Sequence, residues 1–437
     1  MGIETATLLI LAVMIVLMIA GVPLAWITML LAVGCTVLWV GPQALPLVAS
    51  RIYGFANEYV LVAVPLFVLM ACILERSGVA EDLYDAMRLF AGRLPGGVAV
   101  QTTLVAIVMA AMTGIIGGEI VLLGLIALPQ MLRLNYDRKL AIGIICAGGS
   151  LGTMIPPSVV LLVYGLTASV SVSDLFLAAV VPGVFLGTLY ISYVLIRCTL
   201  DPSLGPPAPP EELDIPRDKK LRLLAGLILP IGIIVWIMGS LYAGIASVTE
   251  SAGVGVVAAF LSAAIRRRLD VALIRESLLR TMNTVGVIIW LTLGANAFIG
   301  IYNIMGGTAY LREVIAGLPL APIGIILVMM GILLVLGCIL DWIGICLLTM
   351  PIFVPVIKDL GYDPVWFGVL FCMNMQVSYL TPPFGPAAFY LKSVAPPEIS
   401  LQDIFASMWP FIGLQLVGLA IVLAFPGLVT WLPSIAG

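Results

Sequence analysis

Two acidic residues and two proline pairs stand out, because each lies in apolar sequence and each has a counterpart at nearly the same spacing. Glu119 and Asp341 are 222 residues apart, and Pro156-Pro157 and Pro382-Pro383 are 226 residues apart. Carboxylates in apolar surroundings meet cations, protons or backbone donors. Backbone carbonyls freed by proline are also hard oxygen ligands for a cation. The matched spacing predicts two related polar sites.

The proline pairs predict helices that are interrupted inside a membrane. The interruptions are GGSLGTMIPPS at 148–158 and NMQVSYLTPPFG at 374–385. A freed carbonyl in hydrocarbon must line a cavity or meet a ligand, and a half-helix N-terminus favours an anion. The neighbouring side-chain oxygens are those of Thr153, Ser158, Asn374, Ser378 and Thr381. The alternative is a pair of kinked helices with satisfied backbones, but a matched pair favours a binding site.

The two acids lie at the centres of long apolar stretches, 98–132 and 322–357. A straight helix of 35 residues would be about 52 Å long, too long for a hydrocarbon core of about 30 Å. Each stretch is therefore two spans or a hairpin that returns to its side of entry, and the glycine-rich MTGIIGGE favours re-entry. Ion coupling and hairpin capping are both open for Glu119 and Asp341. A helix cap is favoured for Glu250, and no Lys or Arg is expected at the depth of these acids.

Composition indicates the class of protein. Of 437 residues, 62% are hydrophobic and 10% charged, the mean hydropathy is +1.20, and histidine is absent. A soluble domain carries about 25% charged residues. The chain is therefore predicted to be an all-α polytopic membrane protein and not an enzyme. A net charge of −3 gives no basic surface that could bind nucleic acid. The seven cysteines lie mostly in apolar runs and are interpreted as core residues.

The distribution of basic residues predicts the topology. Single spans are expected near 5–20, 22–40, 58–74, 178–197, 221–239, 243–264, 283–302 and 410–432. Interfacial helices are expected at 80–93, 270–280 and 309–317. With the N-terminus outside and both hairpins returning, 17 of the 20 basic residues lie inside, as cytoplasmic loops require.

The chain is predicted to contain two repeats of opposite orientation, with a site near the midplane between them. Residues 1–200 form the first, with a hairpin at 98–132 and a broken helix at 140–168. Residues 201–220 are a proline-rich cytoplasmic linker. Residues 221–437 form the second repeat, with a hairpin at 322–357 and a broken helix at 364–395.

Several motifs together resemble the large membrane subunit of tripartite ATP-independent periplasmic (TRAP) transporters. They are GVPLAW from Gly21, VPLFVLM from Val64, LGTMIPPS from Leu151, SVTESAGVG from Ser247, LDW at 340–342 and SYLTPPFGPAAFYLKSVAPPE ending at Glu398. The resemblance covers essentially the whole chain. Many members carry a serine-rich tip where this chain has MTGIIGGE. Thr113 is the only hydroxyl there, so ligation through the backbone is expected.

The resemblance implies an elevator-type carrier of the ion transporter superfamily that imports small organic acids with Na⁺. The implied substrates are dicarboxylates, sialic acid, and 2-oxo and 2-hydroxy acids. The implied partners are a periplasmic substrate-binding protein and a small four-helix membrane subunit, in a bacterial inner membrane with the N-terminus periplasmic. No ATP and no cofactor are expected. The hairpins and broken helices would move against a scaffold at 5–40 and 221–264.

The resulting expectations assign site residues to two ligands. The sodium-binding residues are Thr113, Gly114, Gly117, Gly152, Thr153, Pro156, Gly337, Asp341, Ser378, Thr381 and Pro382. The substrate-binding residues are Glu119, Ser150, Pro157, Ser158, Asn374 and Pro383. No transition-metal site is expected. The alternatives are a stand-alone ion-coupled carrier of the same superfamily and, less favoured, an ion channel.

Overall fold

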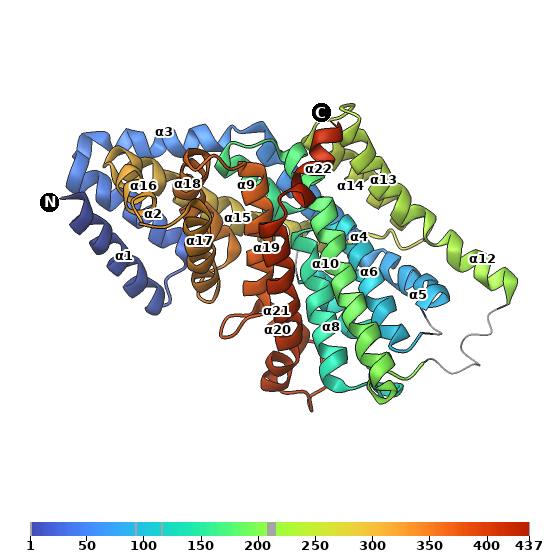
Figure 1. The fold of residues 1–437 in the computed structure, drawn as a ribbon. Helices are drawn as coiled ribbons and strands as arrows, with labels where there is room; N and C mark the ends of the chain where they lie inside the picture. The colour runs from blue at the N-terminus through green and yellow to red at the C-terminus, as the bar shows by residue number, and fades with distance from the viewer. Residues whose placement is uncertain (1, 92–93, 115–116, 208–215, 437) are drawn as a thin grey trace.

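The fold is helical throughout the part of the chain that the computed structural model describes, residues 2–91, 94–114, 117–207 and 216–436 (Figure 1). No strand occurs within these ranges. The middle of the expected linker and residues 115–116 of the first hairpin tip lie outside them.

The helices of the N-terminal part are α1 (Ile3–Ile19), α2 (Leu24–Cys35), α3 (Leu45–Ala56), α4 (Ala63–Arg76), α5 (Val79–Ala91), α6 (Gly97–Thr113), α7 (Gly118–Arg133), α8 (Arg138–Ser150), α9 (Val159–Ala168) and α10 (Val172–Leu200). The helices that follow are α12 (Arg217–Ala225), α13 (Ile228–Tyr242), α14 (Val248–Ile265), α15 (Val271–Ile304), α16 (Gly307–Ala316), α17 (Pro322–Gly337), α18 (Trp342–Asp359), α19 (Pro364–Leu380), α20 (Pro386–Lys392), α21 (Leu401–Ala424) and α22 (Gly427–Ala436).

Many of these helices are long and apolar enough to cross a bilayer. Within the described residues there are seven such spans: Tyr59–Arg76, Val172–Leu200, Leu223–Tyr242, Val248–Ile265, Val271–Ile304, Trp342–Asp359 and Leu401–Ala424. Large apolar side chains on them remain exposed, including Trp236 and Val257, as expected where lipid is the solvent. The prediction of an all-helical multi-pass membrane protein is confirmed.

The centre of the molecule is built around α8 and α19. Every residue of Leu140–Ser150 and of Trp366–Leu380 is buried. A helix that is hydrophobic on all sides is stable only when other elements surround it. Here α21 and α10 pack against both helices (Figure 1). The proline-containing interruptions that follow α8 and α19 therefore start inside the protein.

A second group of helices forms a wall beside this centre. α15 packs against α2, α3, α4 and α18, while α4 also packs against α14 and α6. A separate small core joins α1, α2 and the end of α15 through residues such as Ile10, Ile27 and Phe298. The wall of α4 and α15 thus faces both long apolar stretches, which carry Glu119 and Asp341.

Two sequence predictions in this part were wrong. Residues 270–280 are not a separate interfacial helix, because Asp270 caps the single helix α15, which runs without interruption to Ile304. The last long span begins at Leu401 rather than 410, because Ser400 and Asp403 form a capping box there and Pro410 is accommodated inside α21. The charged residues Arg275, Glu276 and Arg280 concealed the continuity of α15, and Asp403 and Pro410 concealed the start of α21. Glu250, in contrast, completes a capping box with Ser247, as expected for a cap.

Candidate functional site

Each long apolar stretch is divided into two helices that contact each other. α6 ends at Thr113 and α7 begins at Gly118, while α17 ends at Gly337 and α18 begins at Trp342. In the first tip, Gly114 has φ +60° and Gly117 has φ +110°. Glycine is the residue that adopts such backbone angles at low cost, so the tip requires these two positions.

The first tip lies directly on the first proline break. The backbone N–H of Val159 donates to the carbonyl oxygen of Gly114 at 3.2 Å. A Cβ added to Gly114 would lie 1.9 Å from the carbonyl oxygen of Pro157. Backbone therefore meets backbone without an intervening side chain, and the tip closes one side of the break.

Glu119 lies behind this tip and is fully buried. The Oγ1 hydroxyl of Thr113 donates to Oε1 of Glu119 across the tip. Oε2 of Glu119 has no hydrogen-bond partner among the described residues. Thr113 and Glu119 thus join the end of α6 to the start of α7, but neither lines a cavity described below.

The first break, 151–158, is buried throughout. Ser158 caps α9: its hydroxyl accepts from the N–H of Leu161 and donates to the carbonyl oxygen of Thr153. The hydroxyl of Thr153 donates to the carbonyl oxygen of Ser150 at 2.9 Å. Gly152 and the cis-linked Pro156 and Pro157 lie in the same buried segment. Both hydroxyls are therefore already used within the break.

Ser150 and Asn374 join helices of the core. The side-chain N–H groups of Gln376 and Gln415 donate to the carbonyl oxygen and the hydroxyl of Ser150, at 3.1 and 3.3 Å. Asn374 donates to the carbonyl oxygen of Met330 at 2.9 Å and so joins α19 to α17. Neither Ser150 nor Asn374 lines the cavities below.

The second tip brings three of the predicted sodium-binding residues together. Asp341 caps α18 by accepting from the N–H of Ile343 at 3.3 Å. A Cβ added to Gly337 would lie 2.0 Å from the Oγ of Ser378. These residues line a pocket of about 10 Å³ with Phe384, room for roughly one water-sized sphere. Among the described residues no group of three acidic, Cys or His side chains could hold a metal, so a cation here would also need backbone and hydroxyl oxygens.

The second break, 381–385, is more open than the first. The hydroxyl of Thr381 donates to the carbonyl oxygen of Val377 at 2.6 Å, one turn back in α19. Pro382 and Pro383 are joined by a cis bond, and Pro383 and Phe384 are exposed. The two breaks share a sequence pattern but differ in burial.

A cavity of about 390 Å³ lies between the two tips and the wall of α4 and α15. Its lining includes Gly114 and Gly117 from the first tip and Asp341 from the second. The remaining lining residues are Val68, Cys72, Glu75, Gly118, Val159, Val160, Arg280, Thr284, Val287, Ile288, Trp342, Ile343, Tyr379 and Tyr390. Its volume lies in the range typical of small-molecule sites, about 300–1,000 Å³.

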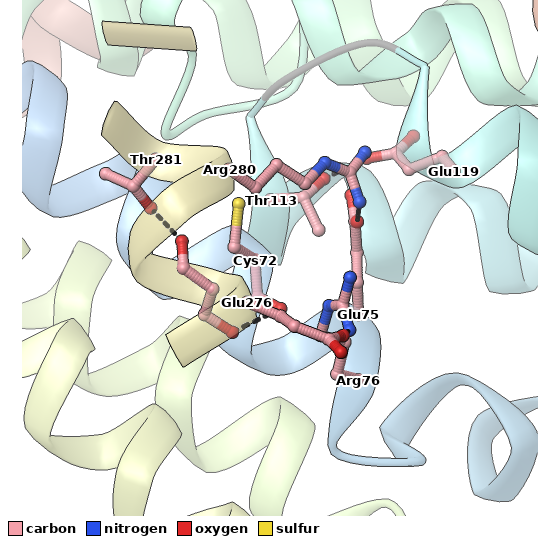
Figure 2. A network of polar contacts seen from close by, with 9 residues as sticks. Cys72, Glu75, Arg76, Thr113, Glu119, Glu276, Arg280 and Thr281 are labelled. Atoms are coloured by element: carbon pink, nitrogen blue, oxygen red, sulfur yellow. Dashed lines mark hydrogen bonds and ion pairs between the residues drawn. The ribbon is translucent and has the colours of Figure 1, made fainter. Parts of the chain in front are cut away.

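Two charged residues of this cavity, Glu75 and Arg280, were missed by the sequence predictions. Arg280 donates to Oε2 of Glu75 at 2.6 Å, beside Thr113 and Glu119 of the first tip (Figure 2). No Lys or Arg was expected at the depth of the acids, but Arg280, which belongs to the continuous helix α15, lines the same cavity as Asp341. The available signal was a spacing of four residues between Arg280 and Thr284, and between Val68 and Cys72, which places each pair on one helix face.

Comparisons with known proteins agree with the helical architecture. The sequence model of the family described as "Tripartite ATP-independent periplasmic transporter, DctM component" matches residues 11–428. The C4-dicarboxylate TRAP transporter large permease protein DctM of Pseudomonas aeruginosa is 29% identical over 405 residues, 92% of each chain. The sialic acid TRAP transporter large permease protein SiaM of Vibrio cholerae is 26% identical over 422 residues, 96% of each chain. The YdaH transporter of Alcanivorax borkumensis shares the fold, with a TM-score of 0.62 and 16% identity over 90% of each chain.

Proposed function

Because the chain belongs to the DctM component family of tripartite ATP-independent periplasmic transporters, we propose that this large permease subunit imports small organic acids together with Na⁺. A periplasmic binding protein delivers the acid, and a small four-helix membrane subunit completes the complex in the inner membrane, with the N-terminus periplasmic. The names of relatives support acidic substrates, since two similar permeases are named for C4-dicarboxylates and for sialic acid.

The observation that carries this proposal is the cavity where both tips meet the wall of α4 and α15. Among the described residues that line it, the charged ones are Glu75, Asp341 and Arg280, two acids and one base. An anion brought into this partly apolar space would face net negative charge, and unbalanced buried charge is costly. Cations that bind with the anion remove this cost, which supports coupling to Na⁺.

The small pocket at the second tip is the first candidate for a coupling ion. Asp341 supplies negative charge, Ser378 supplies a hydroxyl and the end of α17 at Gly337 supplies backbone oxygen. Oxygen ligands of this kind suit a hard cation. We assign a second ion to the first tip, through the backbones of Gly114 and Gly117.

The position of the cavity also supports an elevator mechanism. One side of it is formed by α4 and α15, and the other by the two tips, the start of α9 and residues of α19 and α20. A solute bound there touches both parts. Sliding of the hairpins and broken helices along the wall would therefore expose the solute first on one side of the membrane and then on the other.

Reconstitution of the complex tests this function. The chain and its small subunit are placed in vesicles with the binding protein, and uptake of labelled succinate, pyruvate and N-acetylneuraminate is measured. Uptake of at least one acid is expected only with the binding protein and an inward Na⁺ gradient. Equal uptake in a K⁺ gradient contradicts Na⁺ coupling. Uptake by the chain alone would instead indicate a stand-alone carrier, and currents above carrier turnover would indicate a channel.

A further inference from the structure

The wall of the large cavity has one polar end. On α15 the residues facing the cavity are Arg280, Thr284, Val287 and Ile288, and on α4 they include Glu75. Spacings of three and four residues place the α15 residues on one face of the helix. Arg280 begins this stripe and aliphatic side chains end it. Such a surface suits a solute with a charged group at one end and a carbon skeleton behind it.

Arg280 has capacity for a further anionic partner. Its side chain is 45% exposed, whereas that of Glu75 is 10% exposed. Among the described residues its hydrogen bond is the one from Nη1 to Oε2 of Glu75. A guanidinium has five N–H donors in a planar fork that matches a carboxylate. The remaining donors are thus available on the cavity side.

Glu75 also contacts the start of α7. A Cβ added to Gly118, the first residue of that helix, would lie 1.6 Å from Oε1 of Glu75. The backbone N–H groups of a helix N-terminus carry partial positive charge and favour an anion. The carboxylate of Glu75 therefore has one oxygen at a helix N-terminus and the other on a guanidinium.

The pair of Glu75 and Arg280 is not the sole charge contact between α4 and α15. The next residue of α4, Arg76, forms an ion pair with Glu276, one turn before Arg280 on α15 (Figure 2). That pair does not line the cavity. Each helix thus presents one acid and one base to the other, and only one of the two pairs faces the cavity. Arg76 and Glu276 therefore link the two helices outside the cavity.

We propose that Arg280 binds the anionic group of the transported acid, and that Glu75 is an internal carboxylate which holds this position between transport events. The incoming carboxylate replaces Oε2 of Glu75 on the guanidinium. Glu75 keeps its second oxygen beside the start of α7, where the helix dipole favours a negative charge. This inference rests on the proposed function for its substrate class, a small organic acid.

Ligand binding to the purified complex tests the proposal without transport. Dissociation constants are obtained from thermal stabilisation in Na⁺ buffer by succinate, pyruvate and N-acetylneuraminate, with neutral succinamide as the uncharged probe. Glu75→Gln removes the competing carboxylate, and the Kd of the acid that binds is expected to fall about three- to tenfold. Arg280→Gln is expected to raise that Kd at least about tenfold.

Two further variants keep the result interpretable. The double variant Glu75→Gln with Arg280→Gln removes both charges of the pair, so no unpaired charge remains. It is expected to fold but not to bind the acid. Arg76→Gln with Glu276→Gln removes the neighbouring ion pair outside the cavity and is expected to leave the Kd within about twofold of the original protein.

Several results would overturn the inference. They are an Arg280→Gln protein that binds the acid like the original, a Glu75→Gln protein with no gain in affinity, and equal binding of succinamide. Absence of binding by all three acids to both the original and Glu75→Gln proteins also overturns it. Failure of the proposed function has a different signature: uptake in vesicles is then independent of Na⁺ or of the binding protein, while these dissociation constants are unaffected.

Discussion

The two tip-and-break regions contain similar sequences but have different surroundings. In the first region, Gly114 of the tip rests on the buried break at 151–158, where its backbone meets that of Pro157. In the second, the tip at 337–342 contacts Ser378 of α19 through a side chain, and the break at 381–385 is partly exposed. The first break is closed by packing, whereas the second is partly exposed. Both tips border the large cavity, and the second tip also borders the small pocket.

The acids show the same contrast. Glu119 is fully buried and bonded to Thr113 of the same tip. Asp341 is half-buried, caps its own helix and lines both the small pocket and the large cavity. Related positions in sequence therefore have different access to a solute. The pattern of residues determines where the helices are interrupted. The neighbouring helices determine which interruption is accessible to a solute.

The contrast is tested most strongly at the tip glycines. Gly114→Ala places a Cβ against the carbonyl oxygen of Pro157 at a left-handed φ of +60°. Because neither backbone can move independently, a loss of more than about 3 kcal/mol in stability is expected. In Gly337→Ala the new Cβ would lie 2.0 Å from Oγ and 2.3 Å from Cβ of Ser378. The helices must shift slightly to admit it, and a loss of about 1–3 kcal/mol is expected. Thermal unfolding of the purified complex measures both.

A second change serves as the control for the smaller effect. Ser378→Gly removes the atoms that the new Cβ of Gly337→Ala would meet. The double variant should therefore be no less stable than Ser378→Gly alone. Equal losses for Gly114→Ala and Gly337→Ala would show that the two tips are closed in the same way.

The two acids provide the next test. Asp341→Asn removes a charge that faces both cavities, so Na⁺-driven uptake is expected to fall at least about tenfold and to depend less on Na⁺. Glu119→Gln keeps an acceptor for the hydroxyl of Thr113 behind the tip. The uptake rate is therefore expected to change by less than about twofold. Initial uptake rates at several Na⁺ concentrations measure both variants. A larger effect of Glu119→Gln than of Asp341→Asn on uptake would show that the carboxylate needed for transport is Glu119, in the first region.

How far sequence could predict this molecule depends on the range of each interaction. The all-helical, multi-pass fold follows from composition, because a chain with 10% charged residues cannot cover a water-soluble surface. The proline pairs are recognisable because proline acts on its own turn of helix. The difference between Glu119 and Asp341 is not recognisable, since it depends on which helices pack around each tip.

Arg280 shows the same limit. In the sequence it precedes an apolar run and resembles the end of an interfacial segment. Its importance comes from the packing of α15 on α4, which places it at 2.6 Å from Glu75, a residue 205 positions earlier. No local pattern encodes that distance. The cavity, its charge balance and the Glu75–Arg280 pair therefore required the structure.

The hydroxyls at the breaks test the contrast on the smallest scale. Ser158 both caps α9 and donates to the carbonyl oxygen of Thr153 inside the closed region. Ser158→Ala should therefore cost about 1–2 kcal/mol of stability. Thr381 donates only to a carbonyl one turn back in its own helix, so Thr381→Ala should cost less than about 0.5 kcal/mol.

Their effects on uptake should follow the opposite order. Thr381 stands at the open break, one turn after Ser378 of the small pocket. Thr381→Ala is therefore expected to lower uptake and to raise the Na⁺ concentration for half-maximal uptake about two- to threefold. Ser158→Ala should leave that concentration unchanged in the protein that folds, because its hydroxyl is enclosed by the break. If Ser158→Ala shifts the Na⁺ dependence and Thr381→Ala does not, the closed region is the one that exchanges ions.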